Sequence, residues 1–343
     1  MTEANDTRRI DGIQKLRGIA ALAVALYHFS INDRISWPPN IVTAGEFGKF
    51  GVQTFFVISG FILPYSLWKA QYRLRDSGRF LLKRVLRLDP PYLASIVVSL
   101  AALIAAARNG GKAVQITWQQ IALHLGFLTV FSNYEWLNTV YWTLAIEFQF
   151  YLMLALVFPL LKTRSRWLLL GALSGFGWLI PNILFFPGQS SFFLLGIGVF
   201  LAYAGICGVW ESAMWLAASI ALTFWAHGWI ETAVGSVSAL LMVAPWFQHR
   251  SRILGFLGTI SYSLYLLHVP FGEKLLSVTA ARSHGLALFG WFCCDLAMTL
   301  LVSWLFYRLI EYPSQKLAAR VRYVDPQPLP EIRQPLAQSS QLE

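Results

Sequence analysis

The chain has 343 residues, of which 56% are hydrophobic and 13% charged, and its formal net charge is +10. Soluble domains carry about 25% charged residues, so this composition excludes a disordered chain and is not that of a typical soluble enzyme. Three cysteines are too few for a disulfide-stapled secreted domain, and we expect them to be packing residues. In so apolar a chain, the excess of Lys and Arg favours basic loops facing anionic lipid or an anionic cytosolic ligand over nucleic-acid binding.

Ten apolar segments are long enough to cross about 30 Å of hydrocarbon, which takes about 20 helical residues. The sequence therefore predicts an all-α polytopic membrane protein. The first segment has no convincing cleavage site, so we expect it to be retained rather than removed as a signal peptide. The predicted spans are 17–35, 50–68, 91–108, 140–161, 167–185, 191–206, 212–227, 229–247, 254–275 and 286–310.

Basic residues indicate the orientation of the spans, because Lys and Arg concentrate on the cytoplasmic side. Ten spans with a cytoplasmic N-terminus put most of the 27 Lys and Arg residues inside, whereas an eleventh span over 118–133 would divide them almost equally. We therefore expect ten spans with both termini cytoplasmic. The membrane domain would be 1–316, with a non-spanning extracytoplasmic or re-entrant segment at about 109–139 and a disordered cytoplasmic tail over 317–343.

Ionisable groups are costly inside apolar spans, so each is a candidate functional residue. Arg17 and His28 are eleven positions apart, which is three helical turns plus about 20°, so they share one helical face about 16 Å apart. Ala21 and Val24 lie between them on that face and would leave room for a narrow ligand arm. The alternative is an arginine that snorkels to lipid headgroups and a histidine bonded to a neighbouring helix.

Two further features accompany the second and third spans. Ser59 and Gly60 fall in mid-helix within GKFGVQTFFVISGFIL, where small residues permit close helix packing or close approach of a ligand, and packing is the simpler interpretation. Lys83, Arg84 and Arg87 form a basic cluster, with Arg84 and Arg87 on one helical face. The cluster is explained either by topology and anionic lipid or by a phosphate clamp for an anionic cosubstrate.

Two apolar spans carry polar residues on one helical face, three or four residues apart. Together with the histidine of the first span, these stripes imply a polar cavity inside the bundle. For any one of these groups, the alternative is a structural hydrogen bond between helices. The residues are Thr143, Glu147 and Tyr151 in the fourth span and Ser261, Tyr265 and His268 in the ninth.

Taken together, these motifs resemble the acyltransferase-3 family of bacterial integral-membrane acyltransferases. The resemblance covers about residues 10–316. Many members have Asp-Gly before Leu-Arg, where this chain has Gln14-Lys15, and we expect the stand-alone type without an extracytoplasmic hydrolase-like domain. The matching motifs are Leu16-Arg17-Gly18 with ten residues between Arg17 and His28, FFVISGF, RxxR before Pro-Tyr, WTLAIEFQFY, YSLYLLH and IEYPSQK.

The resemblance implies an O-acyltransferase of a bacterial inner (plasma) membrane. Such an enzyme transfers an acyl group, often acetyl, from cytosolic acyl-CoA to a hydroxyl of an envelope or exported glycan. The implied cosubstrate is acetyl-CoA and no metal is required. The implied partners are the acyl-CoA donor, a glycan or lipid-linked sugar acceptor and membrane lipids, with no nucleic acid.

The resemblance and the residue chemistry together assign the site. Imidazole titrates near neutral pH, so the histidine is the natural general base for a sugar hydroxyl. Direct transfer is the expected mechanism, a covalent acyl-enzyme remains open, and the alternative function is a transporter or flippase for a glycan or lipid-linked substrate. The expected catalytic residues are His28, Arg17 and Glu147, the donor-binding residues Lys83, Arg84, Arg87, Ser59 and Gly60, and the substrate-binding residues Tyr151, Tyr265 and His268.

Overall fold

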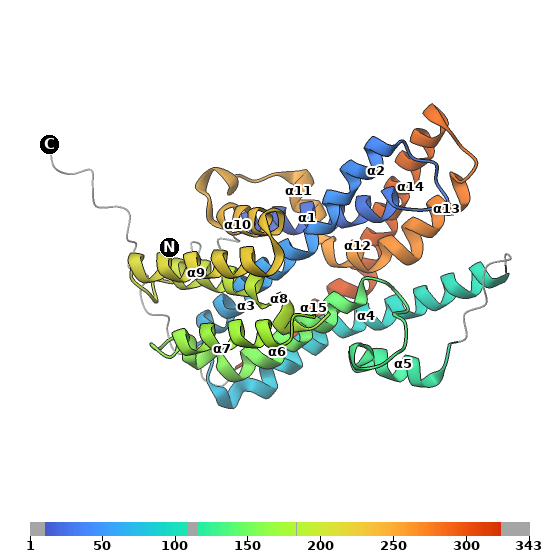
Figure 1. Cartoon of the computed structure of the whole chain (residues 1–343). Coiled ribbons are helices and arrows are strands. Elements are labelled where there is room, and N and C mark those ends of the chain that lie inside the picture. The colour runs from blue at the N-terminus through green and yellow to red at the C-terminus, as the bar shows by residue number, and fades with distance from the viewer. Residues whose placement is uncertain (1–10, 109–115, 183, 324–343) are drawn as a thin grey trace, which may run out of the picture.

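The structure is a computed structural model, and every secondary-structure element in the part of the chain that it describes is helical (Figure 1). The predicted all-α class is therefore confirmed for these residues. Parts of the expected segment 109–139 and of the expected tail 317–343 lie outside the described residues. The structure describes all residues except 1–10, 109–115, 183 and 324–343.

Fifteen α-helices make up the described bundle, together with four short 3₁₀ helices and two π-helical segments, His268–Glu273 and Tyr307–Glu311. The α-helices are α1 (Asp11–Ser30), α2 (Pro39–Glu46), α3 (Gly51–Lys69), α4 (Ser77–Arg108), α5 (Trp118–Leu125), α6 (Tyr141–Leu161), α7 (Arg166–Leu179), α8 (Phe186–Tyr203), α9 (Val209–His227), α10 (Trp229–Val243), α11 (Arg252–Thr259), α12 (Ser261–Leu267), α13 (Lys274–Thr279), α14 (Gly285–Phe306) and α15 (Tyr312–Ala319).

Several of these helices are long and apolar enough to cross a membrane. Five helical stretches meet that description among the described residues, and a sixth does if α11 and the helices after it, bent by 57°, form one span. Each predicted span contains a helix, but α7 and α10 have 14 and 15 residues, about 21 and 22 Å, less than the hydrocarbon thickness. The chain is a membrane protein, whereas ten spans and cytoplasmic termini stay predictions.

The centre of the bundle is the contact between α3 and α8. A Cβ on Gly60 would lie 2.2 Å from the carbonyl oxygen of Phe193, and one on Gly196 would lie 2.1 Å from that of Val57. The two backbones therefore approach as closely as glycine allows. Beside them the rings of Phe56 and Phe193 stack at 4.9 Å, so this pair of helices is a rigid wall for whatever lies next to it.

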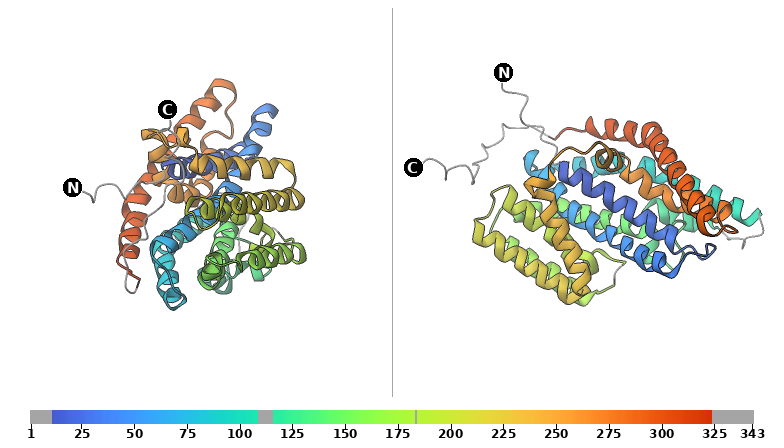
Figure 2. Two further views of the ribbon diagram at one scale, coloured as in Figure 1. Left: turned by 90° about the vertical axis from the view of Figure 1, so that its left-hand side faces the viewer. Right: turned by 90° about the horizontal axis from the view of Figure 1, so that it is seen from above.

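Helix α1 crosses the middle of the molecule. Seen from above in Figure 2, α1 (dark blue) lies between α14 (red) on one side and α9 and α10 (yellow) on the other. It packs closely on α11 and α12, and Ala21 and Ala25 are fully buried in a cluster with Leu264 of α12. The small residues of α1 therefore admit a neighbouring helix.

Helix α5 belongs to the segment between α4 and α6 and is too short to cross a bilayer. Its eight residues span about 12 Å. Its buried His124 donates from Nδ1 to the carbonyl oxygen of Gln120 at 2.7 Å and accepts at Nε2 from the backbone N–H of Leu137 at 3.0 Å. Burial lowers the pKa of His124, which keeps the ring neutral. His124 therefore links α5 to Leu137, later in the same segment.

The folded chain continues beyond residue 316, where the tail was expected to begin. Helix α15 ends at Ala319, and Ala318 is buried. The ring of Tyr323 lies 6.4 Å from that of Tyr72. Burial raises the pKa of Tyr72 to about 12, and its hydroxyl donates to the carbonyl oxygen of Ala155. The first residues of the expected tail are therefore part of the bundle, because they carry apolar side chains that pack on it.

Candidate active site

A cavity of about 330 Å³ lies between α1, α3, α4, α6 and α12. Its wall is mostly apolar, and five Arg and Glu side chains line it. They come from four separate parts of the chain, and they are Arg17, Arg84, Arg87, Glu147 and Glu311. A largely apolar cavity with a few convergent charged groups is the usual form of a small-molecule site.

The cationic part of the cavity combines Arg17 of α1 with Arg84 and Arg87 of α4. One turn separates the two arginines of α4, so they share the face that looks into the cavity. Arg84 Nη2 donates to Ser66 Oγ at 3.3 Å, and its Nε is buried without a hydrogen-bond partner. Three guanidinium groups against two carboxylates favour an anion, and the unpartnered Nε is a donor that such an anion would satisfy.

The two carboxylates of the cavity are held by hydroxyl groups. Ser59 Oγ of α3 donates to Glu147 Oε1 of α6 at 3.0 Å. Glu311, in the π-helical segment Tyr307–Glu311, accepts at Oε2 from the hydroxyl and the backbone N–H of Ser263. Both carboxylates are therefore fixed in position and serve as local counter-charges to the arginines.

Tyr265 lines the cavity on the side nearest His268 and His28. Tyr265 of α12 and Thr143 of α6 hydrogen-bond through their hydroxyls at 2.7 Å, and both line the cavity. The ring centroid of Tyr265 is 5.7 Å from that of His268, which is 5.1 Å from that of His28. The rings of Tyr265, His268 and His28 are therefore neighbours in a row that leads from the cavity to the end of α1.

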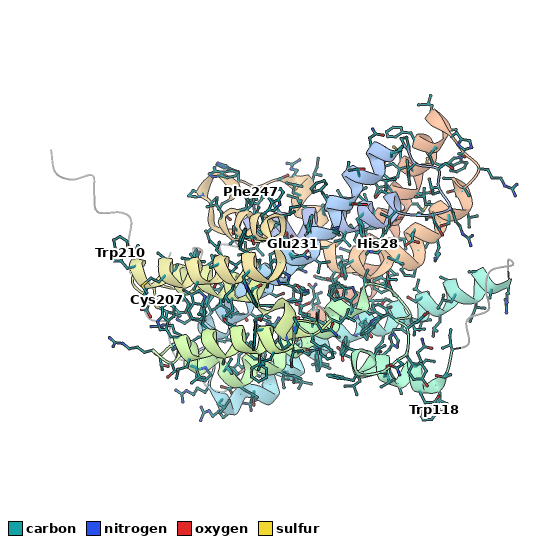
Figure 3. The ribbon with its side chains drawn as sticks, in the orientation of Figure 1. His28, Trp118, Cys207, Trp210, Glu231 and Phe247 are labelled. Atoms are coloured by element: carbon teal, nitrogen blue, oxygen red, sulfur yellow. The ribbon has the colours of Figure 1, made fainter. Side chains whose placement is uncertain are left out.

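His28, labelled in Figure 3, lies in the last turn of α1. It is not among the residues that line the cavity. Its side chain is 17% exposed, and its Nδ1 lies 4.0 Å from Oε2 of Glu273. The carboxylate beside His28 is therefore Glu273, and Glu147 is among the arginines instead. The face of α1 between Arg17 and His28 is packed against α12. The cavity is therefore lined by residues of α3 rather than by the alanines of α1.

The structure brings most of the predicted residues together and separates four of them. Gly60 faces the backbone of α8, which supports helix packing, and Lys83 Nζ lies 5.5 Å from the ring of Tyr323. The other two separated residues are His28 and His268, whose rings lie against each other outside the cavity lining. The predicted residues that line the cavity are Arg17, Ser59, Arg84, Arg87, Glu147, Tyr151 and Tyr265.

Two functional candidates were not assigned a role from the sequence. Glu311 lies in the IEYPSQK motif, and a carboxylate directly after an apolar span was the signal that could have found it. Glu273 follows the last predicted histidine by five residues, and no helical spacing relates it to His28. Within the described ranges, no group of three or more His, Cys, Asp or Glu side chains is arranged to hold a metal ion.

Comparison with known proteins gives the family. The chain matches the acyltransferase-3 model, described as an acyltransferase domain, over residues 10–308. It is 30% identical to O-acetyltransferase OatA of Staphylococcus aureus (strain NCTC 8325 / PS 47) over 171 residues, 46% of this chain and 26% of OatA. It is 25% identical to acyltransferase MdmB of Streptomyces mycarofaciens over 386 residues, 94% of this chain and 96% of MdmB.

A putative O-acetyltransferase of Staphylococcus aureus (strain COL) is 23% identical over 385 residues, 92% of this chain and 59% of that protein. The chain thus spans about a quarter of the length of OatA. No solved structure matches it. The family model covers most of the cavity and both histidines, which supports the expected O-acyltransferase activity. The chain belongs to the acyltransferase-3 family of membrane acyltransferases.

Proposed function

We propose that this protein transfers an acyl group, acetyl in the simplest case, from acyl-CoA to a hydroxyl of an envelope or exported glycan in a bacterial inner membrane. The observation that carries the proposal is the arginine-lined cavity whose far edge leads through Tyr265 and His268 to His28. Two relatives named O-acetyltransferase support the acetyl group.

The donor would bind with its phosphates at the arginines. Coenzyme A carries phosphate groups at one end and a thin pantetheine arm that ends in the thioester. Arg17, Arg84 and Arg87 offer several N–H donors in planar forks that match phosphate oxygens. The apolar part of the cavity suits the arm, and Tyr265 lines the cavity where the acyl end would arrive.

The chemistry would take place between the end of the cavity and His28. Tyr265 moves aside as the thioester enters, since its ring lies between the cavity and His268. His28 takes the proton of the acceptor hydroxyl while that oxygen attacks the thioester carbonyl carbon. The carbon–sulfur bond then breaks, and the departing CoA thiolate takes the proton from His28, so that the enzyme is regenerated.

The test is binding and slow hydrolysis of acetyl-CoA by the purified protein. We expect the wild type to bind acetyl-CoA, Arg84→Ala/Arg87→Ala to lose at least about tenfold in affinity, and His28→Ala to bind without turnover. The matched control is Arg320→Ala/Arg322→Ala, which removes two exposed arginines at the end of α15. A wild type that does not bind acetyl-CoA would refute the proposal in favour of transport.

A further inference from the structure

The carboxylate of Glu273 stands beside the proposed base and has no role so far. Its Oε2 lies 4.0 Å from Nδ1 of His28, and the two side chains are 20% and 17% exposed. Its other oxygen, Oε1, lies 3.8 Å from Nζ of Lys274. One carboxylate oxygen therefore faces the half-exposed ammonium group of Lys274 and the other faces the imidazole of His28.

The backbone at Glu273 is held against the end of α1 by several contacts. The buried Asn32, just after α1, donates from Nδ2 to the carbonyl oxygen of Glu273 at 3.2 Å and to Ser277 Oγ at 2.8 Å. A Cβ on Gly272 would lie 2.7 Å from Cζ of Phe29, so the two segments touch there. These contacts fix the separation of Glu273 and His28 independently of their side chains.

The same short segment supplies a second imidazole. His268 and Glu273 are the first and last residues of one π-helical segment. Such π-helical turns often occur at functional sites. Nδ1 of His268 donates to the carbonyl oxygen of Leu264 at 3.1 Å, which makes Nε2 the acceptor nitrogen. That Nε2 is buried without a partner. His28 therefore lies between a neutral imidazole and a carboxylate.

We infer that Glu273 is a positioning residue for His28: its carboxylate holds the proton on Nδ1, so that Nε2 is the basic nitrogen. The inference rests on the proposed function. The gap of 4.0 Å is longer than a hydrogen bond and closes by about 1 Å in the reacting complex, where catalytic contacts tighten. A carboxylate on the far nitrogen of a catalytic histidine fixes its tautomer and stabilises the imidazolium.

The proton balance is complete without a further group. Nε2 of His28 accepts the hydroxyl proton as the oxygen–carbonyl carbon bond forms, and the imidazolium is paired with the carboxylate of Glu273. When the carbon–sulfur bond breaks, Nε2 returns that proton to the CoA thiolate. Glu273 stays ionised throughout, and Nδ1 keeps its proton.

The experiment compares Glu273→Gln with the wild type in steady-state transfer or hydrolysis of acetyl-CoA. Gln has nearly the same shape, and the contacts of the Glu273 carbonyl oxygen are unchanged, so the fold is expected to persist. We expect kcat to fall at least about tenfold while KM for acetyl-CoA stays within twofold, since Glu273 is outside the cavity lining. Glu273→Asp should restore part of the loss.

Two controls separate positioning from a structural effect. Asp33→Asn removes an exposed carboxylate near the same turn and should keep the wild-type kcat. Glu273→Gln should leave the thermal unfolding midpoint in detergent at the wild-type value, because a residue that acts through His28 changes kcat and not the fold. An unfolding midpoint that falls together with kcat would overturn the inference.

The two proposals fail in different ways. A Glu273→Gln variant with wild-type kcat beside an inactive His28→Ala variant overturns the role of Glu273 and leaves His28 as the base. A His28→Ala variant with wild-type kcat overturns the base assignment, and the role of Glu273 falls with it. Binding of acetyl-CoA, measured on each variant, confirms that the donor cavity is intact.

Discussion

The hydroxyl of Tyr265 hydrogen-bonds to Oγ1 of Thr143 at 2.7 Å and joins α12 to α6 at the edge of the arginine-lined cavity. The ring of Tyr265 also meets Phe55 edge-on at 5.6 Å and His268 at 5.7 Å. One side chain therefore separates the donor cavity from the histidine pair, and its hydroxyl holds it there.

Tyr265→Phe keeps the ring and removes the contact with Thr143. Thr143 retains its hydrogen bond to the carbonyl oxygen of Val140, so no buried group is orphaned. We expect acetyl-CoA affinity within twofold of wild type and several-fold faster hydrolysis without an acceptor, because a looser ring admits water to the thioester. The measurement is release of free CoA. An unchanged or slower hydrolysis would contradict a separating role for Tyr265.

Ser59→Ala removes the hydroxyl that donates to Glu147. The carboxylate then loses a partner inside the bundle, and we expect the free energy of unfolding to fall by about 1–3 kcal/mol. Thermal unfolding in detergent gives the value. Ser174→Ala is the matched control, since Ser174 bonds only its own helix at the Leu170 carbonyl oxygen and should cost less than about 0.5 kcal/mol. Equal losses in both variants would show that the contact with Glu147 is energetically unimportant.

Gly60→Ala tests whether this position serves packing or the donor. The added Cβ would collide with the backbone oxygen of Phe193, which cannot move without displacing α8, so we expect a loss of stability of about 1–3 kcal/mol or more, or failure to fold. Gly175→Ala in α7 has open space around its Cβ and should be neutral or slightly stabilising. A Gly60→Ala variant of normal stability that no longer binds acetyl-CoA would restore the donor-binding interpretation.

The sequence predicted the helical segments well because their signal is local. A run of apolar residues of sufficient length identifies a helix wherever it packs, and the stripe Thr143, Glu147, Tyr151 follows from the helical period alone. Glu147 was found for the same reason, since it is a charged residue inside an apolar span, whereas Glu311 was missed. The meeting of Arg17 with Arg84 and Arg87 is a feature of the structure.

The parts that were not predicted depend on how helices pack. The alanines between Arg17 and His28 are compatible with a ligand groove or with a neighbouring helix, and only the position of α12 decides between them. Glu273 reaches His28 because the chain turns through a π-helical segment whose register no apolar pattern specifies. Glu147 was expected among the catalytic residues together with His28, whereas it lines the cavity of the arginines and is held there by Ser59 on α3.

Arg84 and Arg87 are expected to recognise a phosphate of the donor. If Arg84 and Arg87 contact the 3′-phosphate of CoA, dephospho-CoA, which lacks only that phosphate, should compete with acetyl-CoA more weakly than CoA by about 10-fold or more, because a charge-assisted contact contributes about 1.5–3 kcal/mol. In Arg84→Ala/Arg87→Ala the two competitors should become nearly equal, since the contact that distinguishes them is gone. Added salt should weaken CoA more than dephospho-CoA in the wild type.

Competition binding with both ligands on both proteins measures all four affinities and hence the coupling between the phosphate and the arginine pair. A coupling near zero, with equal losses for both ligands, would mean that the arginines act on another part of the donor or only maintain the cavity. A large coupling would orient the donor, because the nucleotide end would then lie at α4 and the thioester could only point toward Tyr265, the edge from which the rings lead to His28.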